Sequence, residues 1–419
     1  MSKTAFIVHG ARTPFARMGT DFTGVSAVDL GRTAAVEAMA RSGIEPAAVD
    51  QTIFGNIATP VDAANIARVI ALRAGVPKEK PAHSVSRNCA SGIESVVEAA
   101  RLVAIGEADV VLAGGVENMT QIPFFYRDSV KGVFAKAGTA KTAGQRIGAL
   151  AGMPWKDLMN PVIGLKQGLN DPVCDLGMGD TAEILAKEGK ITREEQDHFA
   201  LRSHQRATEA RAKLALEIVP VPVPPDYDRV LTFDNGVREN QTMEALAKLK
   251  PVFDRRYGTV TAGNSSQITD GGAAVVVASE EFVVRHGLRP LGRIASWGFA
   301  GLEPERMGLG PSRATPIALK KAGLSMSHIG LVEMNEAFAA QVLANLKAFA
   351  TSPELGEIHE DNLNVNGGAI ALGHPVGSSG TRLILTLLLE MQRRKVRHGL
   401  ATLCVGGGQG ASIILERES

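Results

Sequence analysis

The spacing of apolar positions along the chain changes back and forth between that of a strand and that of a helix. This predicts strands interspersed with helices. A mostly apolar run at 3–9 and a continuous one at 108–115 are typical of strands, the second of them buried. Residues 26–42 instead follow the spacing of a helix, and the same scheme of strands and helices returns toward the C-terminus. This alternation is typical of an α/β fold.

The second half of the chain repeats the first. Residues 40–56 align without a gap on residues 320–336, so that Gly43 falls on Gly323 and Gly55 on Asn335. Each segment has the pattern of a helix end, a glycine cap, a short loop and a buried strand. Self-similar composition is the alternative explanation, but an ungapped match favours a true repeat.

A gapped match extends the repeat from 88–115 to 373–408. Both segments contain a turn of small residues, a long helix and an apolar strand that ends in glycines. The helix at 381–391 is apolar on nearly every side, which predicts that it is buried between layers. Two such halves, each with one central helix, predict a five-layered αβαβα sandwich.

The repeat is interrupted in the middle of the chain, where proline, glycine and charged residues are scattered around one helical stretch at 181–213. We predict an N-terminal half made of 1–120 plus 251–282, an inserted loop or lid domain at 121–250, and a C-terminal half at 283–419. The insertion is expected to cover a site.

One part of the insertion, residues 124–166, is strongly basic. It carries seven basic residues against two acidic ones, a local net charge of +5. A basic amphipathic segment suits an anionic ligand, a membrane face or a partner protein, and a solvated lid is an equally good interpretation. The basic residues alternate with Val133, Phe134, Ile147, Leu150, Trp155, Leu158 and Ile163.

Composition limits the classes of function. The 419 residues carry 45 basic and 44 acidic side chains, so the net charge of +1 gives no reason to expect a nucleic acid partner. The N-terminus lacks the apolar core of a secretory signal, and no run of about 18 apolar residues occurs. We therefore expect a soluble, cytoplasmic protein. Its three cysteines favour free thiols over disulfides or a zinc site, and no metal-ligand spacing is present.

Cys89, in SVSRNCASG, lies where a strand-like run ends and a helix begins at Ala90. The free N–H groups and positive end of that helix would stabilise a thiolate and raise its reactivity near neutral pH. Taken alone, a single cysteine is more often an inert core residue. The small residues that follow it, Ala90 to Gly92, leave room for a ligand and favour a nucleophile.

Three more residues occupy similar places in the second half. His374 stands before the second central helix, in the position that corresponds to Cys89, and can take a proton from a thiol. Cys404 precedes Gly406 in CVGGGQG, where glycines let backbone N–H groups face a developing oxyanion. Asn335, in EMNEAFA, can hold a water or a carbonyl oxygen through its amide, although an asparagine there often only makes a turn.

Together, the blocks NCASG, NEAFA, GGAIALGHPVGSSG and CVGGGQG resemble, in order and spacing, the catalytic blocks of the thiolase family. The resemblance also includes ARTPF, GGVENMT, MGDTAE, GTVTAGNSSQITDGGAA and GPSRATP, and thus covers nearly the whole chain. It implies the five-layered thiolase fold and a ping-pong transfer of acyl groups between CoA thioesters. CoA is then a substrate, and no metal or redox cofactor is tightly bound.

The resemblance assigns a role to each residue. Cys89 is the nucleophile that becomes acylated, His374 is its base, and Cys404 is the acid and base for the carbon that leaves or attacks. Asn335, through a water, and His374 form one oxyanion site, and the N–H groups of Cys89 and Gly406 form the other. The matching CoA-binding positions are Arg238, Phe253, Ala262, Ser266 and Phe338.

Gly177 favours one branch of the family. Biosynthetic acetoacetyl-CoA thiolases typically have a His-Met pair where this chain reads Gly177-Met178. The chain therefore resembles most the thiolase subunit of fatty-acid β-oxidation complexes, which implies a 3-ketoacyl-CoA thiolase and a homodimer or homotetramer. A hydratase/dehydrogenase partner subunit is a further implication of this resemblance. An acetoacetyl-CoA thiolase is the alternative, although some members of the favoured subgroup carry His in place of Asn335.

Two other functions are alternatives to a thiolase. A ketoacyl synthase would surround its cysteine with two histidines, whereas here only His374 is present. A non-catalytic CoA-binding or scaffolding subunit could lose Cys404 or His374, and both are retained.

Overall fold

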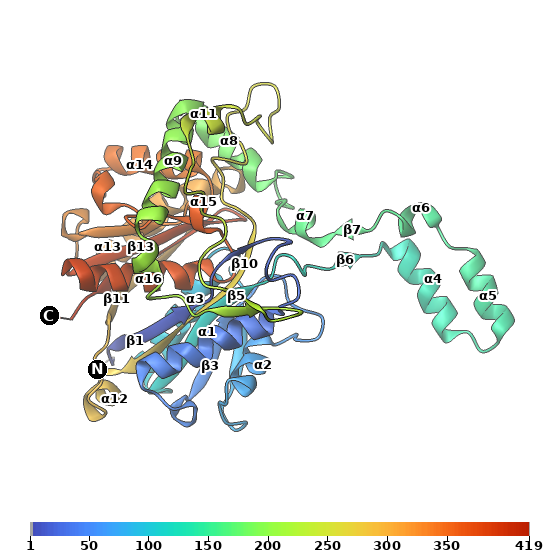
Figure 1. Ribbon diagram of the computed structural model, residues 1–419, viewed down its shortest axis with the longest axis horizontal. Coiled ribbons are helices and arrows are strands. Elements are labelled where there is room, and N and C mark those ends of the chain that lie inside the picture. Colours follow the sequence, from blue (N-terminus) through green and yellow to red (C-terminus); the bar gives the residue numbers. More distant parts are fainter. Residues whose placement is uncertain (1–2, 419) are drawn as a thin grey trace.

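Strands from both halves of the chain join into one mixed sheet in the computed structural model, which describes residues 3–418 (Figure 1). The halves meet where Phe6 and Ile7 pair with Arg293 and Gly292. Across the sheet the order is β12 (Leu331–Met334), β13 (His398–Val405), β14 (Gln409–Glu416), β11 (Gly292–Gly301), β1 (Ala5–Arg12), β10 (Thr269–Ser279), β5 (Val110–Glu117), β3 (Gln51–Gly55) and β4 (Ala82–Val85), with β2 (Ala16–Arg17) beside β10.

The two halves have the same topology. From the centre outward, β1-β10-β5-β3 and β11-β14-β13-β12 each contain two antiparallel pairs followed by a parallel pair. Helix α1 (Ala27–Ser42) ends at Gly43 and α13 (Gly310–Ala322) ends at Gly323, with φ of 64° and 66°. This left-handed conformation needs glycine because a Cβ would be strained there. The predicted repeat is confirmed.

Three hydrophobic clusters stack the elements in five layers. On one outer face, α1 and α2 (Ile66–Arg73) pack against β1, β5 and β10. On the other outer face, α13 and α14 (Ala339–Thr351) pack against β12, β13 and β14. Between the halves, α3 (Ser91–Ile105) and α16 (Ser379–Arg394) contact strands of both. The predicted α/β sandwich is thus observed, with its two sets of strands joined at one edge.

The two central helices cross with backbone against backbone. A Cβ on Gly92 would lie 2.6 Å from the backbone nitrogen of Thr381, and one on Gly380 would lie 2.5 Å from that of Ile93. The hydroxyl of Thr381 donates a hydrogen bond to the carbonyl of Gly92 at 3.1 Å. Because the crossing lies in the first turn of both helices, it places their N-termini side by side.

The prediction that 381–391 is buried is confirmed, but the helix is not purely apolar. Arg382 is fully buried and pairs with Glu333 of β12 at 2.8 Å. One turn later, the hydroxyl of Thr386 donates to Glu217 at 2.8 Å. A polar stripe thus runs along α16, and partners from distant segments satisfy part of it.

The single helical stretch predicted at 181–213 is wrong. The structure has three helices there, α8 (Met178–Glu188), α9 (Arg193–Glu209) and α10 (Arg211–Leu214). Lys190 breaks the first with a φ of 49°. Thr192 then caps the next, and its hydroxyl oxygen accepts from the N–H of Glu195 at 3.1 Å. A Thr-x-x-Glu capping box starts a new helix even where the hydrophobic pattern continues.

The basic segment forms an arm that projects away from the layers (Figure 1). Strands β6 (Phe124–Phe125) and β7 (Val162–Ile163) pair at its base. Its helices are α4 (Asp128–Thr139), α5 (Ala143–Ala151) and α6 (Trp155–Leu158), followed by α7 (Gly164–Gly168).

Within residues 3–418, no helix has both the length and the apolar character that crossing a bilayer requires.

The other elements complete the fold around the sheet. The remaining helices and strands are η1 (Pro46–Ala48), β8 (Val221–Val223), β9 (Arg229–Leu231), α11 (Met243–Ala247), α12 (Glu280–Arg285), η2 (Pro304–Leu309), η3 (Met326–His328), η4 (Glu360–Asn362) and α15 (Ala369–Leu372).

The crossing of α3 and α16 predicts a stability effect. Gly92→Ala should lower the free energy of unfolding by about 1–3 kcal/mol, because the new methyl overpacks against backbone. Gly301→Ala is the control, since its Cβ would meet only one atom, at 4.0 Å. Urea denaturation of the two variants measures the difference. Equal stabilities would contradict the close crossing.

Candidate active site

Cys89 lies between β4 and α3, and the residue before it contacts the turn between β13 and β14 of the other half. The backbone N–H groups of Cys89 itself and of Gly406 lie near its sulfur and act to lower the pKa of the thiol. Gly406 belongs to the turn between β13 and β14 of the other half. Two N–H donors that converge on one point from two chain segments are the arrangement that stabilises an oxyanion.

The expectation that the helix N-terminus makes Cys89 a ready thiolate is wrong. Desolvation by the surrounding protein raises the pKa of Cys89 to about 11, and the two N–H donors counteract this only in part. The nearby charge of Glu117 raises the pKa further. At neutral pH Cys89 is therefore a thiol, and it needs a base before it can act as a nucleophile.

His374 is able to be that base. It lies in the turn before α16, and its backbone N–H donates to the carbonyl of Gln267 at 3.1 Å. Burial lowers the pKa of its imidazole to about 4, and the charge of Arg382 adds to this effect. The ring is thus neutral at pH 7, and its Nε2 is buried with no protein partner.

Ser379, a residue that the sequence reasoning missed, fixes the tautomer of His374. The Oγ of Ser379 lies 2.5 Å from Nδ1 of His374 and donates its own proton to the carbonyl of Pro375 at 3.0 Å. The oxygen must therefore accept the proton of Nδ1–H, which leaves the lone pair on Nε2. The sequence feature that could have predicted this role is a hydroxyl residue in the first turn of the helix, five residues after a histidine.

Cys404 lies on β13, beside Cys89. Burial raises its pKa well above the usual range, and the proximity of Cys89 raises it further. Cys404 is 1% exposed and packs in a cluster with Met178 and Phe338. A protonated thiol in an apolar pocket next to the nucleophile can donate a proton to a carbon that leaves.

Asn335 follows β12, and its backbone N–H donates to Thr402 of β13 at 3.0 Å. Its side-chain amide is fully buried, and neither Nδ2 nor Oδ1 has a protein partner. Leaving buried polar atoms unpaired costs free energy, so such an amide indicates a place for water or for a substrate oxygen.

Three of the predicted CoA-binding residues lie next to this cluster. The rings of Phe253 and Phe338 are 6.2 Å apart in an edge-on arrangement. The N–H of Ser266 donates to the carbonyl of Ala337, the residue before Phe338, at 2.9 Å. Phe338 packs with Cys404, so these residues form an apolar approach to the thiols.

The other two predicted CoA-binding residues lie on the surface. Ala262 is exposed, and so is Arg238. The backbone N–H of Arg238 donates to Nδ1 of His204 at 3.1 Å. Burial lowers the pKa of His204 to about 4, with a further contribution from the charge of Arg238. Among the described residues, no cation–π contact joins Arg238 to the aromatic pair.

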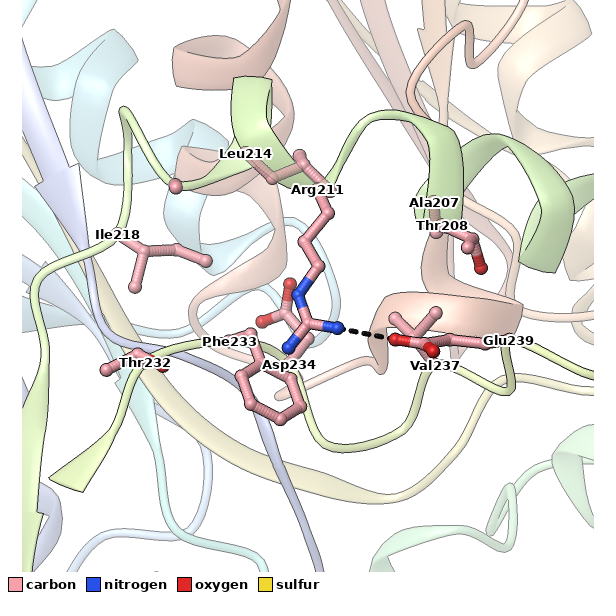
Figure 2. Close-up of a pocket in the computed structure, with 11 residues that line it drawn as sticks. Ala207, Thr208, Arg211, Leu214, Ile218, Thr232, Phe233, Asp234, Val237 and Glu239 are labelled. Atoms are coloured by element: carbon pink, nitrogen blue, oxygen red, sulfur yellow. Dashed lines mark hydrogen bonds and ion pairs between the residues drawn. The ribbon is translucent and has the colours of Figure 1, made fainter. Parts of the chain in front are cut away.

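A cavity of 220 Å³ lies beside Arg238, since its two neighbours in the chain, Val237 and Glu239, line it (Figure 2). Arg211 lies over the ring of Phe233 at 4.1 Å and pairs with Glu239 at 2.5 Å. Asp234, at the same cavity, is held by Arg12 at 2.6 Å. Each charged group of its lining is thus paired, Asp234 with a residue outside the lining, and none of the predicted catalytic residues lines the cavity.

Comparison with protein families identifies the family of the chain. Models of the thiolase N-terminal and C-terminal domains match residues 5–281 and 288–417. The chain belongs to the thiolase family. As a thiolase it is an acyltransferase that acts on CoA thioesters.

Similar proteins cover the chain over its full length. The 3-ketoacyl-CoA thiolases of Serratia proteamaculans and Colwellia psychrerythraea are 42% and 41% identical to it, over 98% of this chain and 96% and 97% of theirs. Human mitochondrial 3-ketoacyl-CoA thiolase superposes with a TM-score of 0.88 at 38% identity, covering 100% of this chain and 99% of that one. Acetyl-CoA acetyltransferase from Syntrophomonas wolfei reaches 0.90 at 32% identity, with complete coverage of both chains.

The low pKa of His374 predicts an unusual pH dependence. Since only neutral imidazole can take the proton of Cys89, kcat/KM for C–C cleavage should stay level as the pH falls through 6.5, the ordinary value, and decline only as it nears 4. Initial rates, with circular dichroism to confirm folding at each pH, measure this. A decline centred near 6.5 would contradict the assignment.

Removal of the Ser379 hydroxyl should disturb the tautomer of His374. Ser379→Ala is expected to lower kcat/KM about 10-fold, because Nδ1 loses its acceptor and Nε2 carries the proton part of the time. The matched control is Ser378→Ala, because the adjacent hydroxyl has no partner. If both variants lost activity equally, Ser379 would have no specific role.

Proposed function

We propose that this thiolase is a 3-ketoacyl-CoA thiolase, which cleaves a 3-oxoacyl-CoA with CoA into acetyl-CoA and a shortened acyl-CoA. The observation that carries the proposal is the site at the junction of the halves, where the Cys89 sulfur faces N–H donors from both halves and lies beside Cys404. The curated relatives at 41–42% identity are named for this activity.

The first half-reaction makes an acyl-enzyme. His374 takes the proton of Cys89, and the sulfur attacks the 3-oxo carbonyl carbon, whose oxygen receives hydrogen bonds from the N–H groups of Cys89 and Gly406. The C2–C3 bond then breaks, and its electron pair forms the enolate of acetyl-CoA. Protonated His374 and a water held by Asn335 bind the enolate oxygen while Cys404 gives its proton to C2.

The second half-reaction restores the enzyme. The thiol of CoA gives its proton to Cys404, and its sulfur attacks the acyl group on Cys89. The Cys89–acyl bond breaks, and Cys89 recovers its proton from His374. These steps move only protons and an acyl group, so the proposal includes CoA as a substrate and no tightly bound metal or redox cofactor.

The substrate chain length is proposed from Gly177. This residue stands at the N-terminus of α8, next to Met178, which packs against the Cys404 cluster. With a φ of −68° the position does not require glycine, and an added Cβ would meet only Oδ2 of Asp180 closer than 3 Å. A small residue here leaves room for an alkyl tail, as in degradation of fatty acids by β-oxidation. A pocket closed to longer tails would favour the acetoacetyl-CoA alternative.

The experiment that tests this function is thiolysis of 3-oxoacyl-CoA substrates of increasing length. Each buried methylene contributes about 0.8 kcal/mol, so kcat/KM should rise from four carbons to medium chains by about one to two orders of magnitude. Gly177→His should reduce the gain for long chains and spare the four-carbon substrate.

A steep fall beyond four carbons in the natural protein would move the assignment to an acetoacetyl-CoA thiolase. A folded protein with no turnover of any substrate would instead favour a non-catalytic, CoA-binding or scaffolding role.

For the arm at 124–166 we propose peripheral attachment to an anionic lipid surface. All seven of its basic side chains are exposed. So are large apolar ones, among them Phe124 at 66%, Ile147 at 68% and Trp155 at 67%. Basic and aromatic side chains together suit the boundary between lipid headgroups and acyl chains. A hydratase/dehydrogenase partner is the alternative occupant, and a homodimer or homotetramer is the proposed assembly.

Attachment through the arm should depend on salt. Exposed charges are screened over about 8 Å at physiological ionic strength. The fraction of the protein that sediments with phosphatidylglycerol vesicles should therefore fall as the salt concentration rises. Lys136→Glu with Lys141→Glu should abolish it, whereas Arg285→Glu with Arg289→Glu, on and after α12 of the body, should not. Equal binding by both variants would leave the arm without this role, and binding of a purified hydratase/dehydrogenase alone would favour the protein partner.

A further inference from the structure

The two residues before the nucleophile reach from the N-terminal half to the turn that carries Gly406. The side-chain amide of Asn88 donates to the carbonyl of Gly406 at 2.7 Å. The guanidinium of Arg87 donates through Nη1 to the side chain of Gln409, at the end of the same turn, at 3.0 Å. The turn is therefore attached at both ends to the segment of Cys89.

The pairing of Val405 with Gln409 closes the turn at its base, and the glycines between them have few contacts of their own. Gly407 and Gly408 have φ of 87° and 74° and carry no side chains that could pack. A Cβ on Gly407 would find only one atom within 4 Å, Nδ2 of Asn88. On the far side, the carbonyl of Gly408 accepts from the N–H of Leu302 at 2.8 Å. Asn88 thus gives the Gly406 peptide a side-chain hydrogen bond from the N-terminal half.

Asn88 is itself held rigidly. Its φ of 44° lies in the left-handed region, which asparagine tolerates better than most residues with a side chain. Its carbonyl accepts from the N–H of Ser91 at 3.0 Å and from the hydroxyl of Ser91 at 2.8 Å. The backbone of Asn88 is thereby fixed to the first turn of α3, and its side chain transmits that position to the opposite turn.

Arg87 is fixed in a similar way. Its Nε donates to Glu94 of α3 at 2.5 Å, and its guanidinium lies over the ring of Phe299 of β11 at 4.3 Å. The backbone N–H of Arg87 donates to the hydroxyl of Ser91 at 2.8 Å. Its bond to Gln409 therefore comes from a side chain that is already ordered.

We propose that Asn88 and Arg87 are positioning residues of the oxyanion site, which hold the Gly406 N–H in register with the Cys89 N–H. This inference rests on the proposed function, because it concerns the site where the acyl group is transferred. Loss of the Asn88 bond should therefore slow acyl transfer to and from Cys89. Removal of the α-proton of acetyl-CoA depends on Cys404, Asn335 and His374 and not on the Gly406 N–H. The rate of this step should therefore be unchanged.

Two substitutions of Asn88 separate its amide from its backbone. Asn88→Gly keeps the left-handed φ and removes the donor. Asn88→Asp keeps the size of the side chain but sets a carboxylate oxygen against the carbonyl of Gly406. Lys190→Gly is the matched control, since Lys190 has a φ of 49° and lies on the surface between α8 and α9.

The rate of acetylation of Cys89 by acetyl-CoA, from quenched samples by mass spectrometry, should fall about 10–100-fold in Asn88→Gly and at least as far in Asn88→Asp. Exchange of acetyl-CoA α-protons with deuterated solvent should stay within about threefold of the natural protein. The control should match the natural protein in both, and the midpoint of thermal unfolding reports folding of each variant.

Acetylation of Asn88→Gly at the natural rate would overturn the proposal. So would equal losses of acetylation and exchange, because that result would indicate a general structural role. Absence of both reactions in the natural protein is a separate outcome, which would contradict the proposed function itself.

Discussion

The contact of α3 with α16, where backbone meets backbone because Gly92 and Gly380 carry no side chains, determines where the reactive groups of this protein lie. Each helix is preceded by a turn that carries one of the catalytic side chains, Cys89 in one half and His374 in the other. A crossing farther along either helix would separate these turns. Close packing at this one point therefore builds a site from two halves that are each incomplete.

Burial then sets the chemistry of the site. It raises the pKa of Cys89 to about 11 and lowers that of His374 to about 4, so the resting pair is uncharged. An uncharged thiol is a poor nucleophile and also a poor target for oxidants. Reaction therefore depends on groups that stabilise the negative charge as it forms, chiefly the N–H groups of Cys89 and Gly406. The bonds that hold the Gly406 turn matter for this reason.

Much of this arrangement could be predicted from the sequence. The glycine caps at Gly43 and Gly323 revealed the repeat, and the repeat with its buried helix gave the five layers. The candidate site residues came from the resemblance of four short blocks to the thiolase family, and the glycines in three of those blocks indicated turns and close backbone approaches.

What could not be predicted depends on distant contacts. The pKa of Cys89 is set by desolvation, which no local pattern reports, and the helix terminus alone suggested the opposite shift. Ser379 and Asn88 have their roles through single hydrogen bonds across turns. The break at Lys190 was missed because the apolar spacing continues through it, and the local pattern of residues 124–166 predicts helices but not the direction in which the arm projects.

The most direct test of the central claim is to locate the acyl group after brief exposure to acetoacetyl-CoA without free CoA. The account predicts an acetyl mass on the peptide that contains Cys89. It predicts the same adduct when Cys404→Ser is exposed to acetyl-CoA, because the departing CoA thiolate is a good leaving group and needs little help from an acid. That variant should have lost most C–C bond turnover, because transfer of a proton to and from carbon depends on the Cys404 thiol. An adduct on Cys404 or Cys174, or a folded Cys404→Ser protein that is not acetylated at all, would contradict it.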